Sequence, residues 1–387
     1  MQAIILDLLS IVPYYTGYLS RDLARQGVDV RLASVTYHLD PTWFHSIGVP
    51  NQATLDTARW YRPESSAIRQ PLKLIEYLFN LLALALRLIF RRPNVLHVQF
   101  LPLVARGFPF EMWLLKLARA LGVRVVYTVH NVLPHDSSAA LRQRYRDIYE
   151  LADQLIAHDE HARQKLGGEF GIPAAKVSVI PHGPLFDEPP AAGSAARERE
   201  RLGIAPDACI VVTQGIIRPY KGVPFLLDAW KQVAAAHPSA VLRIVGTGDD
   251  DILAGIRAKV QELGLEKSVL LDLRFLTVDE VRSCLDGADV LAYPYKDITT
   301  SGALLTGVNY GKAVVATTLP AFELLLENER NSLLVPYADV DALAGAISRL
   351  VADRALRQRL GQALSQAEFR STGWREIAAA TRECYLG

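Results

Sequence analysis

Cysteine is scarce in this chain of 387 residues. Its three cysteines, Cys209, Cys284 and Cys384, are isolated, and none belongs to a CxxC pair or to a cysteine–histidine spacing. Isolated thiols favour a reducing compartment and predict no metal site. The chain also opens without the charged start and small-residue cleavage site of a signal peptide. We therefore expect a cytoplasmic protein without a bound metal or other cofactor.

The sequence also lacks an excess of charge of either sign. Its 42 basic and 41 acidic residues give a formal net charge of +1. Without a strong positive field the chain is not expected to bind nucleic acid. Low-complexity tracts and short repeats are absent too, whereas half of the residues are apolar. Strand and helix patterns alternate throughout, which indicates a folded α/β protein.

An uninterrupted membrane-spanning run is missing as well. Residues 74–90 are very apolar, but Glu76, Asn80 and Arg87 interrupt them. A bilayer requires about 20 apolar residues, so this segment is not expected to cross one. One interpretation is a helix that covers the sheet. The other is that part of it rests on an anionic membrane surface, at the inner face of the membrane, through its basic flanks, which are Arg69, Lys73, Arg91 and Arg92.

Two domains of similar size are expected, because the chain is too long for one compact core. The first half alternates strands and helices: strands are predicted over 3–8, 28–34, 95–99, 123–129, 154–158 and 177–181, and helices over 18–26, 110–121 and 141–152. Prolines and small residues over 186–194 indicate the linker. We place one domain at 1–185 with a last helix, 370–387, packing back onto it, and the second domain at 195–369.

Loops in the second half predict an anion site. Apolar strands lead into Gly215 and Gly246, and parallel strands deliver their loops to one edge of a sheet. Arg218 and Lys221 follow Gly215 and suit phosphate oxygens, with Pro219 holding both cations to one side. Ser301-Gly302-Ala303 begins a helix, where free amides bind phosphate. The alternatives are solvated surface charges and an ordinary serine cap.

Histidine marks the corresponding edge in the first half. His130 ends a predicted strand, so it would hold a sugar hydroxyl or steady developing charge, unless it is a buried, hydrogen-bonded residue. His135 and Asp136 follow it in a loop and are predicted to bind the acceptor. His182 is predicted to touch the donor. His97, in the middle of an apolar strand, is predicted to be structural.

The order of these motifs resembles the retaining glycosyltransferases of family 4. It comprises TVHN (128–131), IPHG (180–183), GIIRPYKG (215–222), VGTGDD (245–250), GADVLAYP (287–294), TSG (300–302), GKAVVAT (311–317) and the run 320–335. The resemblance implies the GT-B fold, in which two Rossmann-like α/β domains face each other across a cleft. It also implies sugar transfer from a nucleotide diphosphate sugar without an obligatory metal. Lys221 matches the family's diphosphate-binding lysine, the 301–303 amides its phosphate loop, and His130 its sugar-contacting histidine.

The chain departs from the family pattern at several positions. Ile298 and Thr306 occupy the places of two glutamates eight apart, and the second glutamate normally holds the ribose. Asp297 and Thr306 are therefore candidate donor-binding residues, together with Thr300, Gly215 and Gly246. Ile216 stands where the family has its arginine, two residues before Arg218. The loop 10–17 lacks a glycine pair, which leaves Gly17 as a candidate acceptor contact.

The predicted function is transfer of a hexose from a UDP- or GDP-sugar to a glycan or lipid-linked glycan, with retention, in bacterial-type polysaccharide or glycolipid assembly. His130, Arg218 and Lys221 are the predicted catalytic residues, because charge aimed at the departing diphosphate is the strongest means of catalysis available. A degenerate GT-B protein that binds a nucleotide sugar or a partner enzyme is the alternative.

Overall fold

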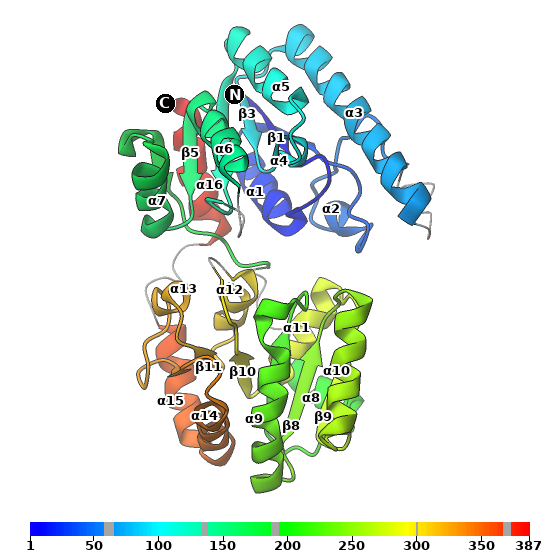
Figure 1. Ribbon diagram of the computed structural model, residues 1–387, viewed down its shortest axis with the longest axis vertical. Coiled ribbons are helices and arrows are strands. Elements are labelled where there is room, and N and C mark those ends of the chain that lie inside the picture. Colours follow the sequence, from blue (N-terminus) through cyan, green and yellow to red (C-terminus); the bar gives the residue numbers. More distant parts are fainter. Residues whose placement is uncertain (58–65, 134–137, 187–192, 299–300, 367–372) are drawn as a thin grey trace. The chain divides into compact units, whose positions relative to one another are not determined.

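The computed structural model describes residues 1–57, 66–133, 138–186, 193–298, 301–366 and 373–387, with only the backbone of 66–69 (Figure 1). The chain divides into two compact units, Met1–Gly183 with Thr372–Gly387, and Pro184–Ser371. The first unit ends two residues before the predicted boundary at 185. Leu185 belongs to the second unit because its amide donates to Thr306 Oγ1 over 2.8 Å.

The first unit contains a parallel sheet in the order β2-β1-β3-β4-β5-β6. Each strand lies within a range predicted from its apolar run or overlaps it by all but one residue. The strands are β1 (Gln2–Leu6), β2 (Asp29–Ala33), β3 (Val95–Val98), β4 (Arg124–Val129), β5 (Gln154–Ala157) and β6 (Val177–Val179). Almost every residue of β3, β4 and β5 is buried, as expected for parallel strands covered on both faces.

Helices cover both faces of this sheet. One face packs against apolar residues of α3, α5, α6 and α7, while α16 packs against α1 (Figure 1). Trp374 begins α16, is buried, and stacks on Tyr18 of α1 at 5.6 Å, so the last helix packs onto the first unit. The helices are α1 (Pro13–Arg25), α2 (Trp43–Ser46), α3 (Ser66–Arg91), α4 (Pro102–Ala105), α5 (Phe110–Ala120), α6 (Ala139–Leu151), α7 (Glu160–Phe170), the 3-10 turn η2 (Ala174–Lys176) and α16 (Trp374–Leu386).

The second unit repeats this architecture with the sheet order β12-β11-β10-β7-β8-β9, again parallel. Its strands are β7 (Ile210–Gln214), β8 (Val241–Val245), β9 (Val269–Asp272), β10 (Val290–Tyr293), β11 (Ala313–Thr317) and β12 (Leu333–Val335). Its helices are α8 (Ser194–Arg201), the 3-10 turn η3 (Pro219–Lys221), α9 (Val223–Ala236), α10 (Asp250–Glu262), α11 (Val278–Gly287), α12 (Gly302–Val308), α13 (Pro320–Glu323), α14 (Val340–Ala352) and α15 (Arg354–Ser365).

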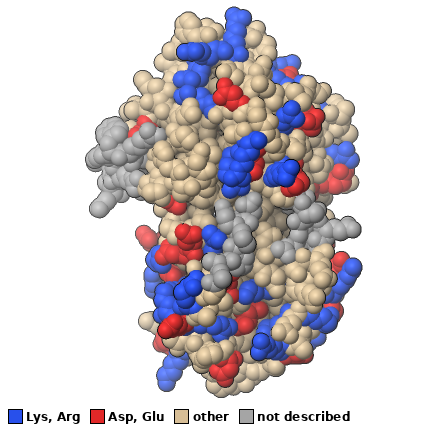
Figure 2. All heavy atoms as spheres, turned by 180° about the vertical axis from the view of Figure 1, so that it is seen from behind, with Lys and Arg blue, Asp and Glu red and all other residues tan. Residues whose placement is uncertain are grey.

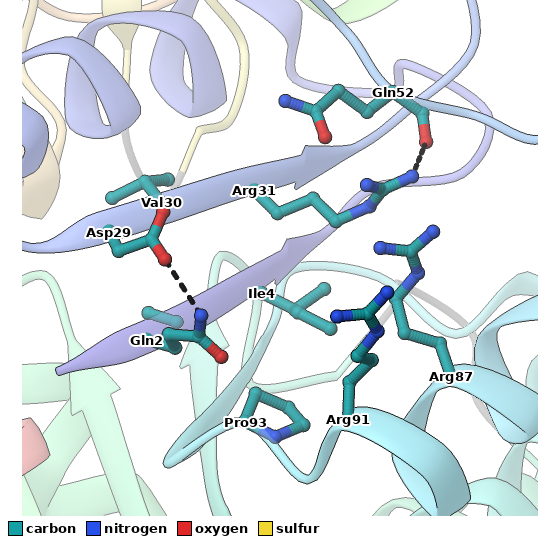
Figure 3. Close-up of a pocket in the computed structure, with 10 residues that line it drawn as sticks. Gln2, Ile4, Asp29, Val30, Arg31, Gln52, Arg87, Arg91 and Pro93 are labelled. Carbon is teal, nitrogen blue, oxygen red and sulfur yellow. Dashed lines mark hydrogen bonds between the residues drawn. The ribbon is translucent and has the colours of Figure 1, made fainter.

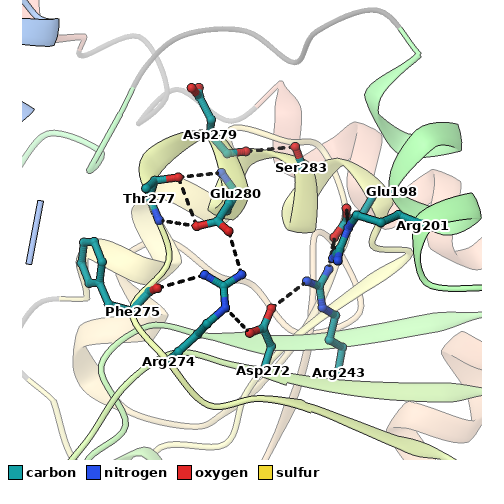
Figure 4. A network of polar contacts seen from close by, with 10 residues as sticks. All are labelled: Glu198, Arg201, Arg243, Asp272, Arg274, Phe275, Thr277, Asp279, Glu280 and Ser283. Atoms are coloured by element: carbon teal, nitrogen blue, oxygen red, sulfur yellow. Dashed lines mark hydrogen bonds and ion pairs between the residues drawn. The ribbon is translucent and has the colours of Figure 1, made fainter. Parts of the chain in front are cut away.

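A buried ion-pair network ties the sheet of the second unit to α8 (Figure 4). Arg243 of β8, whose side chain is 3% exposed, donates to Glu198 of α8 over 2.5 Å and lies 3.3 Å from Asp272 of β9. Asp272 also pairs with Arg274, which continues to Glu280 of α11. Because the guanidinium of Arg243 has two carboxylate partners, the network satisfies a charge that would otherwise be costly to bury.

Charges of both signs are interspersed over the face of the molecule drawn in Figure 2, in agreement with the near-zero net charge. Within the described residues, no helix combines the length and the apolar character needed to cross a bilayer.

Candidate active site

The loops predicted to bind the donor follow β7 and β8 at the carboxyl edge of the second sheet. Gly215 follows β7 with φ +113° and Gly246 follows β8 with φ +136°, backbone conformations that residues with a side chain rarely adopt. A Cβ on Gly246 would lie 2.0 Å from the carbonyl oxygen of Gly215. The structure therefore explains Gly246 by the close approach of two loops.

Lys221 lies directly over this glycine turn. Its Nζ is 2.7 Å from the position of a Cβ on Gly215 and 5.3 Å from the ring centre of Tyr295. The lysine is 8% exposed, and no described residue forms an ion pair or hydrogen bond with Nζ. Burial lowers the pKa of Lys221 to about 8. A buried cation without a counterion favours an anionic ligand, because pairing would offset the cost of its desolvation.

Arg218 does not share this position. Its side chain is 46% exposed, and Nη1 lies 2.8 Å from Oδ2 of Asp249, just before α10. The expectation that Pro219 turns Arg218 and Lys221 to one side is therefore wrong. Asp249 competes for the guanidinium, and the sequence analysis did not anticipate this partner although it follows the VGTG run directly.

The loop before α12 offers amides to the same region. Ser301 Oγ accepts from the amide of Leu304, so the serine caps the helix. The carbonyl of Ala303 accepts from Gln214 Nε2 at 3.0 Å and from the Tyr293 hydroxyl at 3.1 Å, which fixes the loop against β7 and β10. Ala303 lies 3.7 Å from the same Cβ position on Gly215 that Lys221 approaches. The amides of Gly302 and Ala303, which precede the capped amide of Leu304, have no acceptor within the described residues and retain the capacity to bind an anion.

Three other residues, Thr306, Asp297 and Thr300, were predicted to contact the donor. Thr306 has no exposed surface; its hydroxyl donates to the carbonyl of Gly302 at 2.7 Å and accepts from the amide of Leu185. A threonine in this position holds the chain entry to the second unit and presents no hydroxyl to a ribose. Asp297 is exposed in the loop after β10. Thr300 lies outside the described residues.

In the first unit, His130 follows β4 and stacks on Phe100 with ring centres 5.0 Å apart. Its Nε2 donates to Oε1 of Gln99 over 2.9 Å, and its Nδ1 lies 3.3 Å from Nε2 of His158. Burial, followed by the neighbouring histidines, lowers the pKa of His130 well below its usual value. The imidazole is thus neutral, and both of its nitrogens face other side chains in this structure.

Of the predicted acceptor residues, Gly17 is the one that the structure describes. Gly17 lies in the second turn of α1 and not in a loop; a Cβ there would lie 2.8 Å from Cδ1 of Ile47 and 3.1 Å from Nε1 of Trp43. The glycine is therefore explained by packing, and the expected 10–17 loop is shortened by a helix that begins at Pro13. His135 and Asp136 lie outside the described residues.

His97 is structural, as predicted. It has no exposed surface, its Nδ1 lies 2.7 Å from the Tyr385 hydroxyl, and its Nε2 lies 2.7 Å from the Thr128 hydroxyl. By contrast, the sequence analysis missed His158 as a neighbour of His130. The available signal was its position directly after β5, the same place that His130 takes after β4.

Both halves of the chain resemble known glycosyltransferases in sequence. Residues 12–184 match the profile described as Glycosyltransferase Family 4, and residues 208–353 match Glycosyl transferases group 1. A D-inositol 3-phosphate glycosyltransferase of Streptomyces bingchenggensis is 28% identical over 60% of this chain and 52% of its own length. A GDP-mannose-dependent alpha-(1-6)-phosphatidylinositol monomannoside mannosyltransferase of Mycolicibacterium smegmatis is 28% identical over 70% of this chain and 72% of its own. The chain thus spans little more than half the length of several curated relatives it matches.

Solved structures share the fold. The crystal structure of Anabaena HepE in complex with UDP and glucose superposes with a TM-score of 0.78 at 18% identity, covering 100% of this chain and 99% of that one. Sucrose-phosphate synthase from Thermosynechococcus elongatus gives a TM-score of 0.74 at 19% identity, covering 100% and 98%. Both units therefore have the architecture of GT-B proteins. Because one profile spans each unit, the chain belongs to the family 4 glycosyltransferases of the GT-B fold.

Proposed function

We propose that the protein transfers a hexose from a nucleotide diphosphate sugar to a glycan or lipid-linked glycan, with retention of the anomeric configuration. The observation that carries this proposal is the buried, unpaired Lys221 over the glycine turn after β7. Relatives described as acting on inositol phosphate and as GDP-mannose-dependent, and a structural neighbour solved with UDP and glucose, support a nucleotide sugar as donor.

In the proposed reaction, the bond between the anomeric carbon and the diphosphate oxygen breaks while the acceptor oxygen bonds to the same face of that carbon. The acceptor proton passes to the departing phosphate. Lys221 and the 301–303 amides stabilise the charge left on the diphosphate, so no metal is needed there. Arg218 contributes after exchanging Asp249 for a phosphate oxygen, an exchange of low cost because an exposed ion pair contributes little.

A panel of UDP- and GDP-sugars tests the proposal. The expected result is that one donor raises the melting temperature and that its sugar then appears on an extracted lipid-linked acceptor with unchanged anomeric configuration by NMR. Donor binding without transfer to any acceptor would favour the alternative, a degenerate protein that only binds the nucleotide sugar. That alternative has a specific basis, since Ile298 and Thr306 replace the two family glutamates.

Donor affinity is expected to fall as pH rises through about 8. Burial lowers the pKa of Lys221 to that value, and only the protonated amine attracts a diphosphate. Well above the pKa, affinity should approach a roughly 10-fold loss per pH unit, because binding then requires uptake of one proton. Calorimetric titration of the preferred nucleotide sugar between pH 6.5 and 9.5 measures this. In Lys221→Arg, whose guanidinium stays charged, the loss should disappear; an equal loss in that variant would assign the titration to another group.

We further propose that the first unit contacts an anionic membrane through α3 and α5, where a lipid-linked acceptor would be presented. One side of α3 is buried, with Tyr77, Leu81, Leu84 and Leu88 in the core. The other side exposes a continuous apolar stripe, and Phe90 alone is 77% exposed. The buried side fits the interpretation of a helix that covers the sheet, and the exposed side supports the proposed membrane contact. The stripe and its extension around α5 comprise Leu74, Ile75, Phe79, Leu82, Leu86, Ile89 and Phe90, with Phe108, Phe110 and Trp113.

Basic residues accompany this stripe. Arg91 and Arg92 are exposed at the end of α3. Arg87 and Arg91 also line a hollow of about 340 Å³ at the start of β1 and β2, together with Arg31 (Figure 3). The side chain of Arg69 lies outside the described residues. An apolar stripe with a cationic margin is the surface expected of a helix that lies in a membrane interface.

Sedimentation with liposomes at low salt should show preference for anionic over neutral lipid. Replacing Arg91 and Arg92 by glutamine should weaken binding by roughly 30-fold, because each basic residue near the surface contributes about 1 kcal/mol. Leu82→Ser with Phe90→Ser should also weaken it, whereas Leu324→Ser, which removes an equally exposed leucine from the second unit, should not. Equal sedimentation with neutral lipid, or a dimer that Phe90→Ser dissociates, would contradict membrane contact.

A further inference from the structure

Three histidines converge at the carboxyl edge of the first sheet, and no part of the proposed transfer reaction uses them as a group. His130 follows β4, His158 follows β5 and His182 follows β6, three strands that are neighbours in the sheet. One ring nitrogen of each lies within 4.8 Å of the others. Tyr15 of α1 packs against all three rings, with centre-to-centre distances of 4.9 to 5.5 Å. His158 is buried, and the other two are partly exposed, so the cluster is open on one side.

The second nitrogen of each ring is already held by an oxygen acceptor. His158 Nδ1 donates to the carbonyl of Ile180 over 3.1 Å, and His182 Nδ1 donates to the carbonyl of Gly183 over 2.5 Å. His130 Nε2 donates to Gln99 Oε1 over 2.9 Å. These contacts fix the hydrogen on the outer nitrogen and leave a lone pair on the inner one. Histidines that bind metals are oriented in the same way, with the remaining N–H donated to a carbonyl or carboxylate.

The inner nitrogens are arranged as acceptors that face one another. His130 Nδ1 and His158 Nε2 are 3.3 Å apart. Two nitrogens on a tetrahedral zinc ion, each about 2.0–2.1 Å from the metal, stand about 3.3–3.4 Å apart.

We infer that His130, His158 and His182 form a binding site for one divalent cation of the zinc class. Neutral imidazoles suit Zn²⁺, Co²⁺, Ni²⁺ and Cu²⁺, whereas Mg²⁺ and Mn²⁺ prefer oxygen ligands. Three protein ligands with an open side leave a fourth position for water or for an oxygen of a substrate. The cation would fix three loops that follow three separate strands. This site is in the first unit, and the diphosphate residues are in the second, so the inference does not rest on the proposed transfer reaction.

Metal titration of the whole chain, after dialysis against a chelator, tests the inference. Co²⁺ should bind with one equivalent per chain and give the visible absorption of a tetrahedral ion, and Zn²⁺ should displace it and raise the melting temperature. His182→Gln, at a partly exposed position, and His158→Gln should each weaken binding by at least about 100-fold, since even the loss of an outer-shell partner costs 10- to 100-fold. His161→Gln is the matched control, because His161 is exposed on α7, three residues after His158 in the chain. It should bind as the wild type does.

Three results would overturn the site. The first is wild-type protein that takes up no stoichiometric Co²⁺. The second is a folded His182→Gln variant, verified by circular dichroism, that binds the metal as tightly as the wild type. The third concerns inorganic phosphate: if phosphate raises the melting temperature at pH 6, His182→Gln abolishes that effect and Co²⁺ does not bind, the histidines form an anion site instead. His182 is partly exposed, so His182→Gln can be tested for metal binding even if His158→Gln fails to fold.

Discussion

Lys221→Ala should weaken binding of the nucleotide sugar by roughly 10- to 150-fold and slow transfer by at least as much. A charge-assisted contact to a phosphate contributes about 1.5–3 kcal/mol to binding. Lys221 is buried, and no other described cation takes its place over the glycine turn when its side chain is removed. Calorimetric affinity and initial transfer rates measure the two effects separately. Arg218→Ala should have a smaller effect, because its side chain is half exposed and already shares its charge with Asp249.

Stability distinguishes a lost ligand contact from a damaged fold. Lys221→Met keeps the aliphatic length but removes a buried charge that has no partner, so the melting temperature without donor should stay constant or rise. Lys231→Ala, an exposed lysine on α9, is the matched control and should change neither binding nor stability. If Lys221→Met bound the donor normally, the lysine would be a packing residue, and the anion site would have to lie elsewhere.

Most of the framework follows from local sequence. Runs such as 123–129 and 154–158 predicted β4 and β5 because parallel strands covered on both faces are apolar at nearly every position. Gly215 and Gly246 marked the carboxyl edge of the second sheet because loops that cross closely require glycine. These features depend on residues close together in the chain. The structure shows that the last helix packs onto the first unit through the buried Trp374.

Side-chain partners were less predictable, because they depend on which loops meet. Arg218 and Lys221 are three positions apart, and the sequence suggested a shared ligand; the structure separates them, since the turn η3 buries one and directs the other toward Asp249. Thr306 occupied a family glutamate position, yet contacts with Leu185 and Gly302 consume its hydroxyl.

The histidine cluster is a second arrangement of side chains that could not be predicted from the sequence. His130, His158 and His182 have no spacing typical of a metal motif, and they meet only because β4, β5 and β6 are neighbours. Sequence reasoning that searched for cysteine and histidine pairs along the chain therefore predicted no metal. Sheet order, which a single sequence does not reveal, brings the three residues together.

His130→Ala should lower turnover by roughly 100-fold while leaving affinity for the nucleotide diphosphate almost unchanged. In the proposed role, the lone pair on His130 Nδ1 accepts a hydrogen bond from a hydroxyl of the donor sugar. This bond strengthens as positive charge develops at the anomeric carbon, because the hydroxyl becomes a better donor, and only interactions that are stronger in the transition state raise the rate. Removal of one preorganised polar group aimed at charge that develops in the transition state typically costs about 10²- to 10³-fold. Turnover, affinity and melting temperature should be measured on the same preparation.

Three outcomes of that measurement have different causes. A lower melting temperature with full activity per folded molecule would make His130 a packing residue between Phe100 and Tyr15. Loss of turnover in His130→Ala alone would assign a direct contact with the sugar. Equal loss of turnover in His130→Ala and His182→Gln would instead indicate that both histidines act through the cluster and its cation. Zn²⁺ added to chelated wild-type enzyme separates the last two cases. If His130 contacts the sugar directly, chelation should leave turnover unchanged. If the role depends on a cation, turnover should be lost on chelation and restored by Zn²⁺ in the wild type, but not in His182→Gln.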